Sequence, residues 1–211
     1  MATPTSIGLP KLQIAFEAAA QATANRAKKG YAAVIVRDAE AQGLHKLSSA
    51  TLIPAALGAA NQALVQQAFL GSDRGEPSLV YLLVIAPGTS DTTALEAGLK
   101  LLEAVSVDYL AAPADVTDDE LEVLNEWTQA QRALYRTVKL VRPYKTAGSD
   151  DMGIIELDET GLKDASGSVT ASALCGRLAG IFAGIPMGMS ATYVSLPELT
   201  AVTARTSAEQ T

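Results

Sequence analysis

The side chains that most often perform enzyme chemistry are few in this chain and lie far apart in the sequence. His45 is the only histidine and Cys175 the only cysteine. A metal site of several histidines, or a nucleophile triad that needs a histidine base, is therefore hard to build. Cys175 lies in an apolar stretch without a nearby histidine, and an unactivated thiol is a poor nucleophile. We interpret His45 as a surface or loop residue and Cys175 as a buried structural thiol.

Sequence motifs for phosphate or cation binding are also missing. The chain contains no G-x-G-x-x-G and no G-x-x-x-x-G-K-[ST] pattern, so no glycine loop is expected to bring backbone amides to an anion. A group of acidic residues might indicate a cation site: Asp115, Asp118, Asp119, Glu120 and Glu122. Thr117 followed by Glu120 is a capping-box pattern, however, and explains the acids as the start of a helix. We predict no catalytic, cofactor-binding or metal-ligating residue and no enzymatic activity.

Composition and charge indicate a globular protein without affinity for nucleic acid. The chain has 211 residues, of which 48% are hydrophobic, enough for one domain or two small ones with a buried core. A formal charge of -7 argues against binding a phosphate backbone. The densest basic cluster, Arg26 with Lys28 and Lys29, is interpreted as a solvated helix end or turn.

Localisation signals point to the cytosol. A single cysteine excludes an internal disulfide and fits a reducing compartment. The first residues lack the basic start and apolar core of a signal peptide. The longest uncharged apolar run, residues 178–189, is shorter than the roughly 20 residues that a membrane-spanning helix needs. We therefore expect a soluble product that does not insert into a membrane.

Strand and helix patterns alternate along most of the chain. Apolar runs predict strands, helical spacing with capping residues predicts helices, and residues 38–53 are turn-rich without a clear element. Pro54, Thr93, Thr117 and Thr170 mark the expected helix starts. The predicted strands are 31–36, 79–86, 107–111, 137–141, 154–157 and 191–196, and the predicted helices are 54–70, 93–105, 117–135 and 170–186. The order predicts an α/β fold, with a mostly parallel or mixed sheet flanked by helices.

The two ends of the chain differ from this core. Pro4, Gly8 and Pro10 predict an extended N-terminal arm. Leu12, Ile14 and Phe16 then alternate with Lys11, Gln13 and Ala15, which favours a strand over 11–16. The alanine-rich continuation to Lys29 could instead make the whole segment helical. We divide the chain into an arm and entry segment (1–30), a core (31–199) and a flexible tail (200–211).

The helix predicted after Thr170 is unusual because it contains glycine at every fourth position. Gly176, Gly180 and Gly184 lie on one side of such a helix and leave a shallow groove. Each glycine costs about 1 kcal/mol relative to alanine, so three on one face predict close packing against another backbone. Trp127 lies on the helix after Thr117 beside several leucines, and we favour core packing over an interface anchor for it.

The segment around this helix contains in order Cys175, 177–180, Gly184, Pro186, 189–193 and 196–198. This order matches the pattern "C-a-R-i-A-G-i-l-A-G-t-P" followed by "m-S-A-T-Y-y-x-L-P-E-v", and so resembles one family, the contractile tail sheath proteins of bacteriophages, prophages and phage-tail-like bacteriocins. Further segments are similar to the family in the same order: 8–10, Ile14, Phe16, Arg26, 30–38, 94–102, 107–113, Trp127, Gln131, Arg132 and 153–155. The resemblance spans nearly all of residues 8–199.

The resemblance implies a structural role. Sheath subunits form hexameric rings stacked helically around a tail tube, and contraction drives the tube through a target envelope. The implied partners are other copies of the chain, the tail tube protein, the baseplate and the tail terminator, in a virion tail or tail-like particle assembled in the bacterial cytoplasm. Terminal arms exchanged as added strands would place Leu12, Ile14 and Phe16 at a subunit contact.

The sequence leaves open the length of the natural protein and an alternative function. Family members usually continue past the "L-P-E" segment with a C-terminal region, so we expect the chain to be a truncated product or a short variant. The alternative function is a small α/β enzyme or ligand-binding domain, and it requires a concave pocket with polar groups at the carboxyl ends of the strands.

Overall fold

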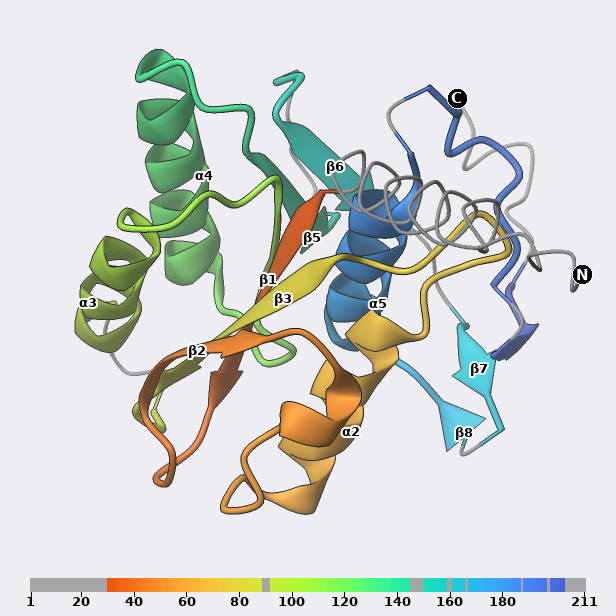
Figure 1. Cartoon of the computed structure of the whole chain (residues 1–211), viewed down its shortest axis with the longest axis horizontal. Coiled ribbons are helices and arrows are strands. Elements are labelled where there is room, and N and C mark those ends of the chain that lie inside the picture. Colours follow the sequence, from red (N-terminus) through yellow and green to blue (C-terminus); the bar gives the residue numbers. More distant parts are fainter. Residues whose placement is uncertain are drawn as a thin grey trace, which may run out of the picture.

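A six-stranded mixed sheet with helices on both faces forms the centre of the protein (Figure 1). The computed structural model describes residues 30–88, 92–144, 150–158, 161–165, 167–186, 188–196 and 198–203. The strand order is β2-β3-β1-β4-β5-β6, and all neighbours are parallel except β2, which runs antiparallel to β3 at one edge. The strands are β1 (Tyr31–Arg37), β2 (Gly43–Leu47), β3 (Leu79–Ile85), β4 (Tyr109–Ala111), β5 (Lys139–Pro143) and β6 (Ile154–Leu157).

Two pairs of helices cover the two faces of this sheet. α3 (Thr93–Leu102) and α4 (Asp118–Ala133) pack on one face, and α2 (Ala59–Phe69) and α5 (Ala171–Gly184) on the other. All seven residues of β3 are buried, because its alternate side chains enter the core on opposite faces. The continuous apolar run that predicted this strand is therefore explained by burial on both sides.

A second, small sheet lies beside the α2 and α5 layer. It contains β8 (Gly167–Ser168), β7 (Lys163–Asp164) and β9 (Leu199–Ala201) in that order, all antiparallel. A short 3₁₀ helix, η1 (Ala50–Leu52), precedes α2. The β7–β9 pairing brings the segment that follows α5 back against the loop between β6 and α5.

The predicted α/β fold is confirmed, and so are two of the predicted helix caps. The Thr117 hydroxyl accepts a hydrogen bond from the Glu120 N–H at 3.4 Å, and the Glu120 carboxylate accepts one from the Thr117 N–H at 3.0 Å. The Thr170 hydroxyl accepts from the Ala173 N–H at 3.1 Å at the start of α5. α5 ends at Gly184, two residues before Pro186.

The predicted strand at 191–196 is wrong. Tyr193 has a φ of 58°, outside the extended region, and the Val194 N–H donates to the Ala191 carbonyl at 3.3 Å. These residues therefore form a turn, and the strand lies later, at β9. The Arg74 guanidinium donates to the Ser190 carbonyl and, at 3.0 Å, to the Thr192 carbonyl, so a contact from a distant loop holds this turn.

Three smaller predictions also need correction. The segment 38–53, left without an element, contains β2. The helix expected from Pro54 begins only at Ala59, because residues 54–57 form a turn in which the Leu57 N–H donates to the Pro54 carbonyl at 3.1 Å. The capping residue of α3 is Thr92 and not Thr93, and its hydroxyl donates to the Glu96 carboxylate at 2.6 Å without capping a backbone N–H.

Candidate functional site

The glycine side of α5 lies directly against other backbone segments. A Cβ atom on Gly180 would lie 2.7 Å from the carbonyl carbon of Ala68 in α2 and closer still to its oxygen. A Cβ on Gly184 would lie 2.7 Å from the Gly75 carbonyl oxygen. The same atom on Gly176 would lie 3.6 Å from a Val34 methyl group, which is ordinary contact. Two of the three glycines therefore allow a backbone approach that alanine would prevent.

Arg177, on the same helix, joins three parts of the chain. Its side chain is buried, and its guanidinium donates to the Gly71 carbonyl at 2.6 Å and to the Gln67 carbonyl at 3.4 Å. These carbonyls lie at the C-terminal end of α2, where the helix dipole favours a positive charge. A third contact, at 2.7 Å, is an ion pair with the Glu198 carboxylate. Arg177 thus fixes the end of α2 and the segment after α5 together.

Cys175 is enclosed in the same layer and is not arranged for chemistry. It is fully buried, and its thiol donates to the Ala171 carbonyl at 3.3 Å. Burial raises the pKa of the Cys175 thiol to about 12, because the charged thiolate would be desolvated. A thiol in this state is a neutral packing group at physiological pH.

Ion pairs occupy the carboxyl edge of the sheet, where ligands bind in many α/β proteins. The strand order reverses between β1 and β4, and this reversal is the usual ligand position. Arg37, the last residue of β1, pairs there with Asp115 and with Glu120, which is almost completely buried. Two of the acids that might have indicated a cation site, Asp115 and Glu120, therefore contact an arginine, and Glu120 also belongs to the capping box of α4. Over the described ranges, no group of His, Cys, Asp and Glu is placed to hold a metal ion.

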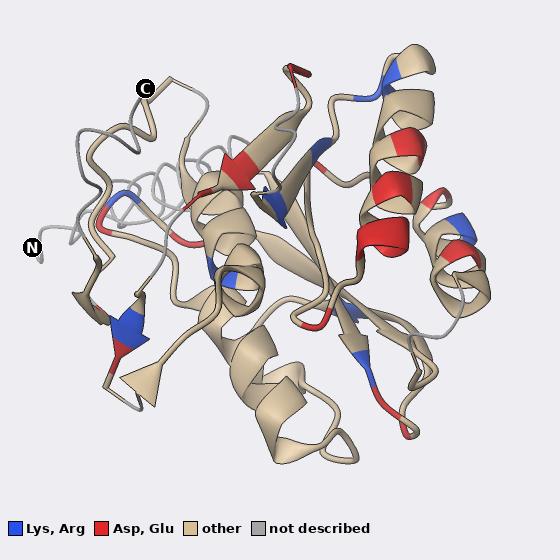
Figure 2. Ribbon diagram, turned by 180° about the vertical axis from the view of Figure 1, so that it is seen from behind, with Lys and Arg blue, Asp and Glu red and all other residues tan. Residues whose placement is uncertain are grey.

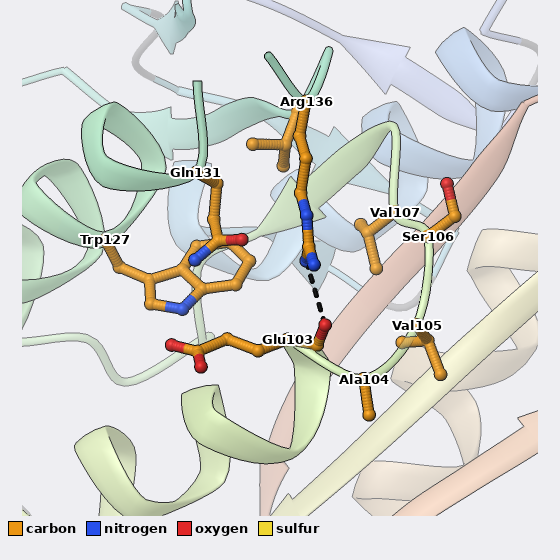
Figure 3. A pocket seen from close by; sticks show the side chains of 9 residues that line it. Glu103, Ala104, Val105, Ser106, Val107, Trp127, Gln131 and Arg136 are labelled. Atoms are coloured by element: carbon orange, nitrogen blue, oxygen red, sulfur yellow. Dashed lines mark hydrogen bonds between the residues drawn. The ribbon is translucent and has the colours of Figure 1, made fainter. Parts of the chain in front are cut away.

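A cavity of about 280 Å³ opens at the opposite, amino edge of the sheet, between the ends of α3 and α4 (Figure 3). Its lining residues are 103–107, Trp127, Gln131, Arg136 and Val138. Trp127 is half-buried and packs against the leucine-rich core, while its indole also forms one wall of the cavity. Sequence reasoning did not find this cavity, because its walls come from three separate segments.

The outer strands of the sheets are the places where another strand could pair. In the described part of the chain, β2 and β6 each pair with one neighbour in the large sheet. An ion pair between Arg142 and Glu156, which lie directly opposite each other, fixes the register of β6 on β5. The predicted contact residues Leu12, Ile14 and Phe16 lie outside the described residues, so their contact with any strand stays a prediction.

The exposed face of α4 is acidic, as Figure 2 shows by the Asp and Glu residues along this helix. Asp118, Asp119, Glu122 and Glu126 are all exposed there. This surface would repel a phosphate backbone. Within the described residues, no helix has the length and apolar character needed to cross a membrane.

Comparisons with known proteins agree with the resemblance seen in the sequence. No protein-family model matches the chain. A tail sheath protein of Clostridium phage phiCD119 is 27% identical over 196 residues, which cover 92% of this chain and 54% of the phage protein. The resemblance to tail sheath proteins is therefore confirmed at the level of sequence similarity.

Two solved structures show the same fold. The sheath tail protein of Desulfitobacterium hafniense superposes with a TM-score of 0.63 and 14% identity, covering 87% of this chain and 65% of that protein. The helical sheath of the anti-feeding prophage in its contracted state superposes with a TM-score of 0.57 and 13% identity, covering 86% of this chain and 55% of the sheath protein. The chain spans between about half and two thirds of the length of these relatives.

Proposed function

We propose that this chain is a structural subunit of a contractile tail sheath. The observation that supports the proposal best is the similarity to the phage tail sheath protein, which extends over 196 residues in one alignment. Two sheath structures that share the fold add to this support. In this role the chain forms rings stacked around a tail tube, and contraction drives the tube through a target envelope.

The contacts of α5 fit a subunit that transmits force. The motif residues Arg177 and Glu198 form an ion pair, so the two halves of the sheath-like segment are joined in space. Gly180 and Gly184 bring α5 against two other backbone segments. A layer held by direct backbone contact has little room to deform, because protein interiors are close-packed. We propose that residues 31–199 move as the core of the subunit, with 1–30 as an arm and 200–211 as a tail.

The partners follow from the same proposal. They are other copies of the chain in hexameric rings, the tail tube protein, the baseplate and the tail terminator, within a virion tail or bacteriocin-like particle assembled in the host cytoplasm. The residues proposed for the contact between copies are Leu12, Ile14 and Phe16, which would add a strand to a neighbouring sheet edge.

The alternative, a small α/β enzyme or ligand-binding domain, has less support. It needs open polar groups at the carboxyl edge, and there Arg37 is paired with Asp115 and Glu120. The Cys175 thiol is buried and has a raised pKa. The cavity lies at the amino edge instead.

Electron microscopy of the purified chain at high concentration tests the proposal. We expect rings, helical tubes or short stacked assemblies, and a gene for a tail tube protein next to the coding gene. A protein that stays monomeric at every concentration, encoded far from any tube or baseplate gene, would contradict the sheath function.

A further inference from the structure

The segment after α5 lies on the outside of the molecule and buries little apolar surface. Figure 1 shows it in dark blue, running from the end of α5 to β9 beside β7. Its described residues are 188–196 and 198–203, and we call them the strap. Met189, Tyr193 and Val202 are 52%, 96% and 50% exposed. β9 has only three residues, and its pairing with β7 contains a register shift. Such a segment is held less strongly than the core of the sheet.

Arg74 holds the first part of the strap from a tight turn in the loop between α2 and β3. The Ser72 N–H donates to the Gly75 carbonyl at 2.8 Å, and the Gly75 N–H donates to the Ser72 carbonyl at 3.0 Å. These two bonds fix the turn that carries Arg74. The Arg74 guanidinium donates to the Ser190 carbonyl and, at 3.0 Å, to the Thr192 carbonyl. An arginine on a fixed turn therefore holds the most exposed part of the strap.

The second part of the strap covers a narrow site on α5. The Glu198 carboxylate pairs there with the buried Arg177 guanidinium at 2.7 Å. Leu196 and Leu199 lie on the two sides of Glu198 in the sequence, and both are partly buried. A cavity of only about 20 Å³ remains between the strap and the core residues of this site: Gln67, Asp164, Val169, Leu174 and Arg177. A glutamate between two leucines therefore fills the site almost completely.

The two contacts of the strap depend on the same support in the core. Arg177 donates to the Gly71 carbonyl at 2.6 Å, and the turn that carries Arg74 begins at the next residue. When Glu198 leaves, Arg177 keeps this carbonyl partner, so opening does not leave a buried charge without a partner. Between the two contacts, every described residue of the strap is exposed or only partly buried. Loss of either contact should therefore loosen the whole strap.

We propose that the strap opens from the core as one unit and uncovers the site on α5 for a peptide segment that carries a carboxylate between two apolar side chains. The charge of Arg177 selects the carboxylate, and Val169 and Leu174 contact the apolar groups. In the closed state the strap itself is the occupant and belongs to the core proposed above. The open state is a minor population, in which an external segment of the same chemistry competes with the strap.

Amide hydrogen exchange of the full chain, followed by NMR, tests whether the strap opens as one unit. Two hydrogen-bonded amides report on its two parts, the Val194 N–H near the Arg74 contact and the Leu199 N–H beside Glu198. We expect both amides to exchange at least about 100-fold faster than those of β3. Arg74→Met should speed both by the same factor, roughly tenfold, and Glu198→Gln should speed both by about threefold.

Arg136→Met is the matched control for the exchange experiment. Arg136 also donates to a backbone carbonyl, that of Glu103 at 2.9 Å, but it has no contact with the strap. Its replacement should leave the exchange of the strap unchanged. An effect of Arg74→Met confined to the Val194 amide, or strap amides as slow as those of β3, would overturn the opening as one unit.

A synthetic peptide of residues 194–203 tests the chemistry of the uncovered site. Its apparent affinity is reduced by the small fraction of protein that is open. We therefore expect the peptide to bind Arg74→Met more tightly than wild type, by the factor measured in the exchange experiment, with shifts of the Val169 and Leu174 amide signals. The same peptide with Glu198→Gln should bind about tenfold more weakly. No binding to Arg74→Met, or equal binding of the two peptides, would overturn the proposed site and leave the sheath function intact, because both tests use the single chain.

Discussion

The two faces of the central sheet are packed in different ways. Small residues dominate the α2 and α5 face, where buried alanines, valines, glycines and Cys175 let α5 approach other backbone segments closely. Leucines dominate the α3 and α4 face, where their long side chains fill the space between the helices and the sheet. On the α2 and α5 face, atoms added to α5 would overlap other backbone segments. On the α3 and α4 face, atoms removed from the leucines would leave cavities that lower the stability. The cavity beside Trp127 lies on the leucine-rich side.

The largest effect is expected from adding a side chain to the small-residue face. Gly180→Leu should prevent folding or assembly, because even a Cβ atom would overlap the Ala68 carbonyl group of α2. Gly180→Ala should lower the free energy of unfolding by about 3 kcal/mol, the upper end for overpacking. Urea denaturation followed by circular dichroism measures both.

Gly176→Ala is the matched control on the same helix. Its Cβ would meet only ordinary contacts, and alanine is the better helix former by about 1 kcal/mol. We expect unchanged or slightly higher stability. Equal losses at positions 176 and 180 would show that close backbone approach is not what distinguishes them.

Removing atoms should be the damaging change on the leucine-rich face. Leu124 is fully buried in α4, and Leu124→Ala should cost about 3 kcal/mol through lost burial and the cavity left behind. Leu101→Ala, at a position 46% exposed in the last turn of α3, should cost less than about 1 kcal/mol. Thermal and urea unfolding compare the two. A Leu124→Ala protein as stable as wild type would contradict the comparison of the two faces.

A smaller loss of stability is expected when Arg177, which joins α2 to the segment after α5, is replaced. Arg177→Met keeps an apolar stem but leaves the Gly71 carbonyl and the Glu198 carboxylate without their partner. We expect a loss of about 2 kcal/mol, below the range for a fully buried pair because Glu198 is partly exposed. Glu198→Gln retains a hydrogen-bond acceptor and should cost less. Hydrogen exchange should show faster opening at the end of α2 in Arg177→Met only.

The smallest effect concerns the start of α4. Thr117→Ala removes the hydroxyl that accepts from the Glu120 N–H and should cost about 1 kcal/mol. Thr117→Ser keeps the hydroxyl and should be close to wild type. If alanine and serine behave alike in a urea titration, the capping box contributes nothing measurable.

Local patterns predicted most of the core, and contacts between distant segments explain what they missed. The run at β3, the Thr117 box and the Thr170 cap could be recognised because each depends on neighbours within a few residues. β2 has weak alternation and forms because β3 offers an edge to pair with. The 191–196 segment was predicted as a strand, but Arg74 donates to the Ser190 and Thr192 carbonyls and the chain forms a turn there.

The candidate functional sites show the same difference between local patterns, which the sequence reveals, and contacts between distant segments, which it does not. The glycine spacing of α5 predicted a groove, but not that Gly180 and Gly184 contact different segments while Gly176 contacts a side chain. The pairing of Arg37 with Glu120, and the cavity around Trp127, join residues far apart in the chain. Neither leaves a periodic signal in the sequence.

Deletion of the coding gene, followed by electron microscopy of tail-like particles from the organism that encodes it, tests the sheath function most directly. The account predicts bare tubes without a contractile sheath, and sheathed particles again when the gene is restored. Normal sheathed and contracting particles in the deletion strain would contradict it.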